Sequence, residues 1–298
     1  MTVIFVMHGL GWQCNKGWMM DFCDLVGVDI ADIHEAFVDA FSEYEVPMDL
    51  PLPRLQTMLT TRDYRPELST ACMADGRIVG FVLVGGRMID GELQAYDCAT
   101  GVIRAFQQQK IGSQLLPLAL ERVRVAGAKR FVLEVLEHNT AAQSLYTKHG
   151  FRITRTLRCY QKTLDASVKS ELVSHQPHLL DPIDEAIYNG FVPTWQNQLA
   201  SYRNDADTFY VVGMTRADTV VAYGVIHRAS GSILQMGVHP AYRDDAVCDA
   251  LVTQLAQAVG TQQVRIVNIE ADSWLDQQLV ASGWQNFVNQ YEMERRFD

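Results

Sequence analysis

The stretch Val102-Ile103-Arg104-Ala105-Phe106-Gln107-Gln108-Gln109-Lys110-Ile111-Gly112-Ser113-Gln114 decides the fold, because it joins the end of an apolar strand to an amphipathic helix. Apolar side chains at helical spacing predict that helix over residues 111–125. The free N–H groups and the dipole of a helix N-terminus attract anions. Lys110 adds a positive charge there, and Gly112 lets a ligand approach the backbone. The stretch therefore predicts an anion-binding turn, with an ordinary strand-to-helix turn as the alternative.

A second motif follows one strand and one helix after this turn, and it reads Asn139-x-Ala141-Ala142-x-x-Leu145-Tyr146-x-x-x-Gly150-Phe151. In this order and at this spacing, the two motifs resemble the acyl-CoA-binding motifs of the GCN5-related N-acetyltransferases, the GNAT family. The turn of that family follows the pattern Arg/Gln-x-x-Gly-x-Gly/Ala, which Gln107 and Gly112 match here. Lys110 departs from the pattern, since it stands where the first glycine is usual.

The resemblance implies an acetyl-CoA-dependent N-acetyltransferase that acts on a primary amine of a small molecule or a peptide. It implies that pantetheine pairs with the backbone at Val102 and Ile103 like an added strand, and that the pyrophosphate binds the amides of the turn. The implied cofactor-binding residues are Val102, Ile103, Gln107, Gln108, Gln109, Lys110, Ile111, Gly112, Ser113, Gln114, Asn139 and Tyr146.

The motif also implies a general acid, Tyr146, which would protonate the departing CoA thiolate. A phenol suits this role because its pKa of about 10 keeps it protonated at neutral pH. Glu134 is the candidate general base, because a lone carboxylate between apolar Leu133 and Val135 is costly unless it faces a cleft or a partner. The alternatives are a Tyr146 that only packs, an Asn139 that only caps its helix, and a Glu134 that is paired at the rim.

Four further residues are candidates for the acceptor pocket. Tyr44 lies in the region that usually covers this pocket in the family, and Glu92, Tyr96 and Asp97 lie on the strand before the turn. Because side chains alternate along a strand, Tyr96 and Asp97 should face opposite sides of the sheet. At most half of the candidates on this strand are therefore expected to line the pocket.

The chain is long enough for two domains, and its second half repeats the first with an offset of 136 residues when Val238 is placed on Val102. Residues 20–164 are the expected acyl-CoA-binding domain, 165–171 a linker and 172–298 a degenerate copy, while residues 1–19 fit no element. Each domain is expected to be α/β (α+β), with a mixed, mostly antiparallel central sheet flanked by helices.

Some local elements follow directly from the pattern. Asp29 is the expected N-cap of the first helix of the acyl-CoA-binding domain. Residues 153–158 and 159–164 are expected as a closing pair of strands. Residues 182–199 carry a helical pattern.

The second copy lacks the residues on which the chemistry of the first depends. Asp244 and Asp245 stand at the positions of Gln108 and Gln109, where two carboxylates would repel a pyrophosphate. Likewise Ala246 stands for Lys110 and Cys248 for Gly112. When Gly283 is placed on Gly150, Asp272 stands for Asn139 and Leu279 for Tyr146. The second copy is predicted to keep the fold, to use its aspartates as helix caps, and to have lost CoA binding.

Composition narrows the possible partners. A net charge of −10 argues against binding to nucleic acid or to an anionic membrane, which needs clustered Lys and Arg. The six cysteines are scattered without metal-ligand spacing, which indicates reduced thiols in a cytoplasmic protein and no metal site. A monomer or a homodimer is expected. The functional alternative is a non-catalytic acyl-CoA sensor or an interaction protein.

Overall fold

The computed structural model describes residues 12–13, 19–43, 50–164, 174–217 and 219–298, and these residues form two compact units. The first unit comprises the described residues up to 133, together with 143–152 and 294–298, and the second comprises 134–142 and 153–293. The predicted linker, Tyr44 and most of the predicted N-terminal extension lie outside the described residues. Within that extension, Trp12 and Gln13 form a short strand, so part of it does belong to an element.

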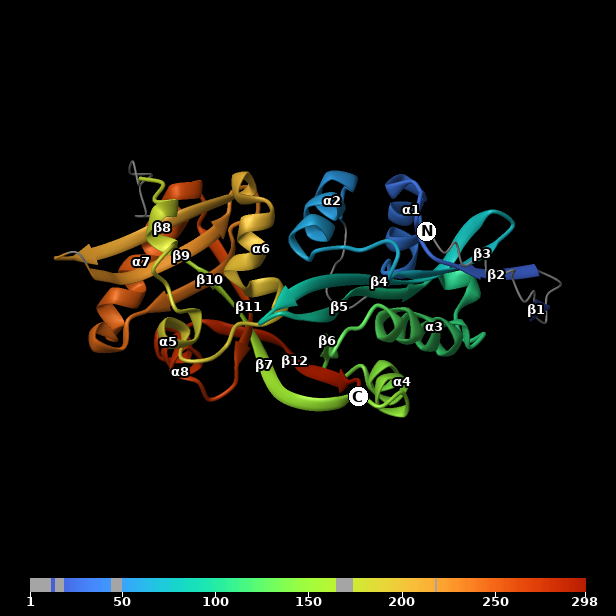
Figure 1. Cartoon of the computed structure of the whole chain (residues 1–298). Helices are drawn as coiled ribbons and strands as arrows, with labels where there is room; N and C mark the ends of the chain where they lie inside the picture. The colour runs from blue at the N-terminus through green and yellow to red at the C-terminus, as the bar shows by residue number, and fades with distance from the viewer. Residues whose placement is uncertain (1–11, 14–18, 44–49, 165–173, 218) are drawn as a thin grey trace. The chain divides into compact units, whose positions relative to one another are not determined.

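The first unit is built on a sheet in the order β1-β2-β3-β4-β5-β6, in which only the β5–β6 pair is parallel. Helices α1 and α2 cover one face of this sheet, and α3 and α4 lie on the other (Figure 1). The elements are β1 (Trp12–Gln13), β2 (Met19–Cys23), α1 (Ile30–Ala40), α2 (Leu52–Thr61), β3 (Thr70–Ala74), β4 (Arg77–Ile89), β5 (Glu92–Val102), η1 (Arg104–Phe106), α3 (Ile111–Val125), β6 (Arg130–Leu136) and α4 (Thr140–Lys148).

Local sequence signals explain several of these boundaries. The Asp29 side chain accepts a hydrogen bond from the Ala31 N–H at 2.9 Å, which confirms the predicted cap of α1. Asp75-Gly76 and Asp90-Gly91 both have positive φ, as two-residue hairpin turns require, and they join β3 to β4 and β4 to β5. Helix α3 has the predicted bounds, and Gly127 follows its end at φ +85°.

A β-bulge interrupts the pairing of β4 with β5. Leu83 lies opposite Ala99 and Val84 opposite Asp97, so Cys98 is the extra residue on β5. The parallel pairing of β5 with β6 ends at Tyr96, the second residue before Cys98. Strand β5 continues to Val102, and the bulge is therefore the place where β5 separates from β6.

The second unit repeats this plan with strands in the order β12-β7-β11-β10-β9-β8. A bulge at Leu234, which is 136 positions after Cys98, interrupts the pairing of β10 with β9, and the parallel β10–β11 pairing ends at Ile233. The elements are β7 (Arg152–Thr163), η2 (Pro177–Leu180), α5 (Glu185–Asn189), η3 (Trp195–Asn197), α6 (Leu199–Asn204), η4 (Ala206–Thr208), β8 (Phe209–Arg216), β9 (Thr219–His227), β10 (Ser232–Val238), η5 (Pro240–Tyr242), α7 (Asp245–Val259), β11 (Gln263–Glu270), α8 (Trp274–Ala281) and β12 (Gln285–Arg296).

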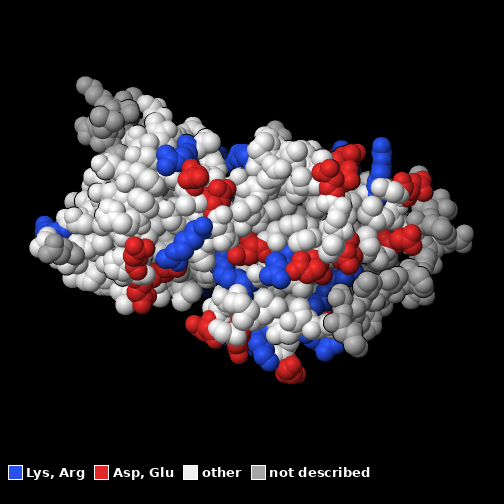
Figure 2. Space-filling model, turned by 45° about the horizontal axis from the view of Figure 1, so that its top comes forward, with Lys and Arg blue, Asp and Glu red and all other residues white. Residues whose placement is uncertain are grey.

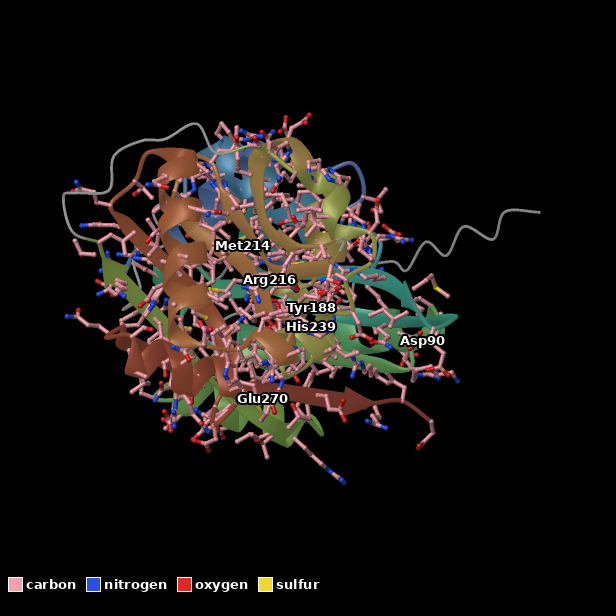
Figure 3. All side chains as sticks on the ribbon, turned by 90° about the vertical axis from the view of Figure 1, so that its left-hand side faces the viewer. Asp90, Tyr188, Met214, Arg216, His239 and Glu270 are labelled. Atoms are coloured by element: carbon pink, nitrogen blue, oxygen red, sulfur yellow. The ribbon has the colours of Figure 1, made fainter. Side chains whose placement is uncertain are left out.

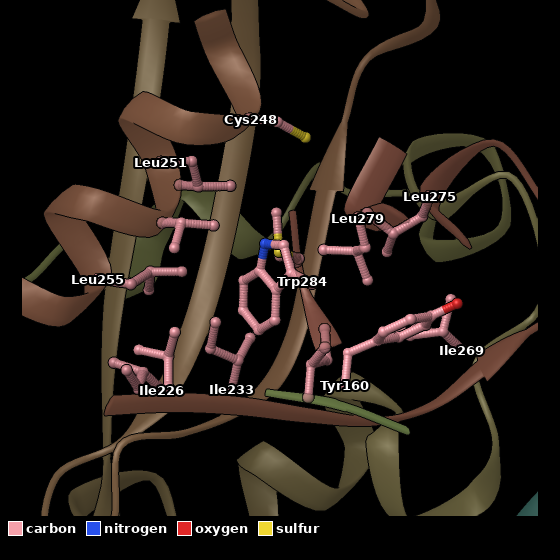
Figure 4. Packing of buried hydrophobic residues seen from close by; sticks show 14 of the residues in the cluster. Tyr160, Ile226, Ile233, Cys248, Leu251, Leu255, Ile269, Leu275, Leu279 and Trp284 are labelled. Atoms are coloured by element: carbon pink, nitrogen blue, oxygen red, sulfur yellow. The ribbon is translucent and has the colours of Figure 1, made fainter. Parts of the chain in front are cut away.

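Two predictions of secondary structure are wrong in the number of segments. The expected pair of strands at 153–158 and 159–164 is one continuous strand, β7, which pairs antiparallel with β11 and therefore belongs to the second unit. Its Tyr160 is buried in the core of that unit, in the same cluster as Ile226, Ile233 and Trp284, and its ring extends toward Ile269 (Figure 4). The expected helix over 182–199 is a series of short segments, because Pro182, Gly190 and Pro193 interrupt the helical pattern.

Charged side chains are interspersed on the surface. On the face that Figure 2 shows, the described Lys and Arg side chains alternate with Asp and Glu rather than forming one continuous basic area. Among the described residues, none of the helices combines the length and the apolar composition needed to cross a bilayer.

Candidate active site

The turn between β5 and α3 leaves a helix N-terminus without a side-chain cap. Lys110 is the N-cap residue of α3, and its side chain makes no capping hydrogen bond. The first N–H groups of the helix have no acceptor within the helix, so they are available to an anion. Lys110 adopts φ +61° and ψ +20°, and Gln108 also has φ +61°. The backbone thus takes the left-handed conformation that the missing glycine of the pattern would allow most easily.

Gly112, in the first turn of α3, has space around its Cα. A Cβ built there would meet only the Leu145 Cδ2 atom within 4 Å, at an ordinary contact distance of 3.6 Å. The protein's own packing therefore does not require glycine at this position. By contrast, a Cβ on Gly101 would come within 2.7 Å of the Phe81 ring, so that glycine is explained by packing alone.

Two glutamine side chains stabilise the turn by hydrogen bonds to its own backbone carbonyls. Gln107 donates from Nε2 to the Val102 carbonyl at 3.3 Å, and Gln109 donates to the Ala105 carbonyl at 3.2 Å. The Ile111 side chain is buried and anchors the start of α3, so its backbone alone is available to a ligand. The side chains of Gln107, Gln108, Lys110 and Ser113 are exposed, and Val102, Ile103, Gly112 and Gln114 are half-buried.

A groove of about 700 Å³ lies beside this turn, on the side of α1. Its lining includes Ile103 and Phe106 together with the carboxylates Asp32, Glu35 and Asp75. A phosphate placed in this groove would face several negative charges. The uncapped end of α3 offers N–H donors to an anion, whereas the groove offers mainly carboxylates beside a single arginine, Arg77.

Asp97 and Tyr146 meet where β5 separates from β6. The Tyr146 hydroxyl on α4 donates to Asp97 Oδ2 at 3.1 Å, and the Thr100 hydroxyl donates to the same oxygen at 2.7 Å. The Tyr146 ring packs edge-on against Phe151, with ring centroids 5.5 Å apart. Both side chains of the pair are buried, with exposed fractions of 8% for Asp97 and 7% for Tyr146.

Burial raises the pKa of Asp97 to about 6, against the lowering effects of its hydrogen bonds and of Arg62. The other carboxylate oxygen, Oδ1, is buried and has no hydrogen-bond partner among the described residues. Such a raised pKa on a carboxylate next to a phenol is typical of a functional site.

Tyr96 faces the other side of the sheet, as the alternation along β5 predicts. The Arg62 guanidinium, which follows α2, lies 6.0 Å from the centroid of its ring and donates to the Cys98 carbonyl at 2.8 Å. Arg62 thus holds the bulge from the face opposite Tyr146. The bulge carbonyl is satisfied by this side chain instead of by a strand partner.

Three other predicted site residues lie at the start of β5, at the start of α4 and on β6. Glu92 is exposed at the start of β5, five residues and roughly 17 Å along the strand from Asp97, so the structure does not support it as an acceptor residue. Asn139 accepts from the Ala142 N–H at 3.1 Å and so caps α4. Glu134 is half-buried on β6, between the buried side chains of Leu133 and Val135, and belongs to the second unit.

Sequence reasoning missed the contact between Asp97 and Tyr146 and the parts played by Thr100 and Arg62. Asp97 was expected as an acceptor residue and Tyr146 as an acid, with no link between them. The one available signal was the carboxylate of Asp97 between Tyr96 and Cys98, because a carboxylate that becomes buried must find a partner.

A model of the Acetyltransferase (GNAT) family matches residues 30–151, a range that includes the turn, Asp97 and Tyr146. Residues 30–151 are therefore a domain of the GNAT type. Acetyl-CoA is the acyl donor of this family. The uncapped N-terminus of α3 and the space at Gly112 fit that donor, because its pyrophosphate needs N–H donors and close approach to the backbone.

Two curated proteins are similar to this chain, and both are named N-alpha-acetyltransferase 30. The protein from Dictyostelium discoideum is 31% identical over 119 residues, which are 39% of this chain and 64% of the relative. The protein from Schizosaccharomyces pombe is 24% identical over 151 residues, which are 50% of this chain and 88% of the relative. The chain therefore spans less than two thirds of the length of the Dictyostelium relative.

Solved GNAT structures resemble nearly the whole chain. A GCN5-related N-acetyltransferase from Sphaerobacter thermophilus has a TM-score of 0.68 at 16% identity, over 93% of this chain and 95% of that one. A tandem GNAT protein from the clavulanic acid biosynthesis pathway has a TM-score of 0.64 at 16% identity, over 93% and 98%. At this identity the likeness shows the fold, and it covers both halves of the chain.

Proposed function

We propose that the chain is an acetyl-CoA-dependent N-acetyltransferase, that residues 20–164 carry out the reaction, and that a primary amine is the acceptor. One observation carries the proposal: the uncapped N-terminus of α3 follows β5, and beside the β5 bulge the buried Tyr146 phenol of α4 donates to Asp97. A diphosphate site and a proton donor thus occur on one stretch of a GNAT fold, as acyl transfer from a thioester requires.

The candidate site residues have the following proposed roles. The amides of 107–114 bind the pyrophosphate, and Lys110 adds a positive charge. The backbone at Val102 and Ile103 pairs with the pantetheine arm, while Asn139 orients the first turn of α4. Tyr146 gives a proton to the thiolate, and Glu134 is the proposed general base for the amine. Tyr96 is a proposed acceptor contact on the opposite face of β5.

The N-terminus of α7 in the second unit argues that this unit does not bind the donor. The Asp244 side chain caps α7 by accepting from the Val247 N–H at 2.8 Å. A carboxylate of the protein therefore already occupies the position where a phosphate would bind. Asp244 thus fulfils the predicted capping role, and the side chain of Asp245 lies outside the described residues.

Bulky side chains also fill the space around the same turn. Arg243, at the position of Gln107, stacks on the Trp274 ring of α8 at 4.6 Å from its centroid. The His239 ring lies 5.5 Å from that of Tyr188 (Figure 3) and 5.7 Å from that of Tyr242. These contacts support a closed turn in the second unit.

Hydrogen bonds between side chains and backbone link β10 to β11 at the bulge of β10. Asn197 donates to the carbonyl of the bulged Leu234 at 2.7 Å. Asn268 on β11 donates to the Thr194 hydroxyl at 3.2 Å, and Thr194 in turn donates to Asn197. A continuous network of hydrogen bonds therefore links β10 to β11. At the corresponding place in the first unit, β5 and β6 separate. In addition, Leu279 replaces the phenol and is buried in the core.

The α-amine of a peptide is the acceptor class that we propose first. Both curated relatives bear the name N-alpha-acetyltransferase, and their similarity to this chain is the support for this choice. A panel of peptide, amino-acid and polyamine acceptors, assayed by release of the CoA thiol, tests the proposal. Peptides are expected to give the highest kcat/KM, and a panel in which another amine class exceeds them would refute the choice.

Titration calorimetry with acetyl-CoA tests the donor site. One site per chain is expected, and it should disappear when the first unit alone is altered by Gly112→Trp. Two sites of similar affinity, or one that survives this substitution, would contradict the assignment. A non-catalytic acyl-CoA sensor is the alternative that the same residues allow, and Tyr146→Phe separates the two. An enzyme loses turnover and keeps binding, whereas a sensor has no turnover to lose.

A further inference from the structure

The hydrogen bonds of Asp97 are distributed unevenly between its two oxygens. Oδ2 accepts from both Tyr146 and Thr100, at 3.1 and 2.7 Å, while the buried Oδ1 accepts from none of the described residues. An ionised carboxylate usually accepts hydrogen bonds at both oxygens when it is buried. The site is therefore built to hold either an ionised or a protonated Asp97.

The direction of the Tyr146 bond raises a chemical difficulty for a general acid. Tyr146 donates its proton toward Asp97, so the proton points at a carboxylate and not at a leaving group. If Tyr146 gave up that proton while Asp97 was ionised, two negative charges would lie about 3 Å apart in a buried site. A neutral Asp97 removes this repulsion.

We propose that Asp97 is the proton source behind Tyr146, so that the two residues act as a relay toward the sulfur of the thioester. The inference rests on the proposed function. As the carbon–sulfur bond breaks and its electron pair stays on sulfur, Tyr146 passes its hydroxyl proton to that sulfur. In the same step, protonated Asp97 passes its proton to the Tyr146 oxygen and becomes a carboxylate. The amine nitrogen loses one proton as the amide forms, and Asp97 regains one from solvent, so protons balance over a turnover.

The described geometry matches the state after this transfer. Tyr146 is then neutral again and donates to ionised Asp97, with Thr100 as a second donor, which is the arrangement observed. The bulge at Cys98 holds Asp97 on the α4 side of β5, where Tyr146 can reach it.

The other groups around Asp97 decide how easily it is protonated. The Thr100 and Tyr146 hydroxyls, the Arg62 charge and the backbone at Ala99 all favour the ionised form, and burial outweighs them. Protonation is therefore accessible close to neutral pH. Asp97 acts through Tyr146 and is a positioning residue in this scheme.

The kinetic test uses Asp97→Asn, which keeps the shape of the side chain and can still donate a hydrogen bond to Tyr146 but cannot pass on a proton. We expect kcat for thiol release to fall at least about tenfold, with KM for acetyl-CoA unchanged. Asp97→Asn combined with Tyr146→Phe should be no slower than Tyr146→Phe alone, because the two act in series. Asp90→Asn is the matched control, since Asp90 lies exposed in the turn between β4 and β5 and its left-handed φ of +52° suits asparagine.

A kcat for Asp97→Asn within twofold of wild type, or a double variant whose losses multiply, would overturn the relay. A wild-type protein that releases no thiol with any amine would instead overturn the proposed function. The infrared carbonyl band of a protonated carboxylic acid is a readout that needs no turnover. We expect such a band in the wild-type protein with acetyl-CoA bound and its loss in Asp97→Asn. A wild-type spectrum without that band between about pH 5 and 7 would overturn the relay, whatever the activity.

Discussion

At the scale of single residues, Asp97 shows how a functional group can reduce stability. A buried carboxyl whose charged form is disfavoured binds a proton more tightly in the folded chain than in the unfolded one. Folding is then most favoured where Asp97 is protonated in both states. The stability that this proton provides decreases as the pH rises through the window between the unfolded and folded pKa values.

The free energy of unfolding should report this effect. The pKa of Asp97 is about 6 in the folded chain and about 4 in an unfolded one, so stability from this group is complete below pH 4 and is lost by about pH 6. Asp97→Asn replaces the titrating carboxyl group by an amide that stays neutral at every pH in this range. Its stability relative to wild type should therefore increase between pH 4 and 7, by on the order of 2 kcal/mol. Urea unfolding at several pH values measures the difference, and a difference that stays constant with pH would contradict the raised pKa.

At the scale of elements, the first turn of α3 contains a glycine, Gly112, that the fold does not require but that a bound ligand would. Gly112 has space for a methyl group, and alanine favours a helix over glycine by roughly 0.5–1 kcal/mol. A glycine that weakens its own helix without a packing reason indicates that something outside the protein approaches the backbone there.

Gly112→Ala should therefore act in opposite directions on stability and binding. We expect the free energy of unfolding to rise by about 0.5–1 kcal/mol, and the affinity for CoA to fall, because the added methyl group lies against the ligand. Chemical denaturation and calorimetry on the same preparation give both values. Ser282→Ala in the second unit, immediately after α8, is a matched small substitution that should leave CoA affinity unchanged. Affinity that persists in Gly112→Ala would show that the ligand does not contact this turn.

Much of the element pattern could be predicted because its signals are local. The bounds of α3 follow from helical spacing, the start of α1 from the Asp29 cap, and the hairpins from their Asp-Gly pairs. The left-handed backbone of Lys110 was not predictable, since lysine gives no sign of it. The Asp97–Tyr146 contact also escaped prediction. It depends on where a bulge in β5 and a helix some 50 residues later come to lie.

At the scale of the whole molecule, chain order and unit membership differ. Strand β7 precedes the predicted linker in sequence, but it pairs with β11 and buries Tyr160 in the core of the second unit. In return, residues 294–298 belong to the first unit, where Phe297 donates its N–H to the Lys129 carbonyl at 2.9 Å and Arg295 donates to the His149 carbonyl at 2.7 Å. Strand partners this far apart leave no local trace, so a boundary at 165–171 was the natural expectation.

Cutting the chain at the predicted linker should therefore fail to yield two stable domains. A fragment of residues 1–164 would carry strand β7 without its partner β11, and a fragment of 172–298 would lack a strand of its sheet. Each alone should be aggregated or partly unfolded by circular dichroism and size-exclusion chromatography. Co-expression of both should restore a soluble, folded pair. Two fragments that each unfold cooperatively on their own would show that the exchanged segments contribute little.

The returning segment at 294–298 also has a consequence for biosynthesis. The first unit needs residues that leave the ribosome more than a hundred positions after Lys129, which at ~5–20 residues per second is a delay of several seconds or longer. During that time the nascent chain exposes an incomplete sheet edge to its surroundings. Ribosome-bound intermediates should therefore stay protease-sensitive until residues 294–298 have left the ribosome.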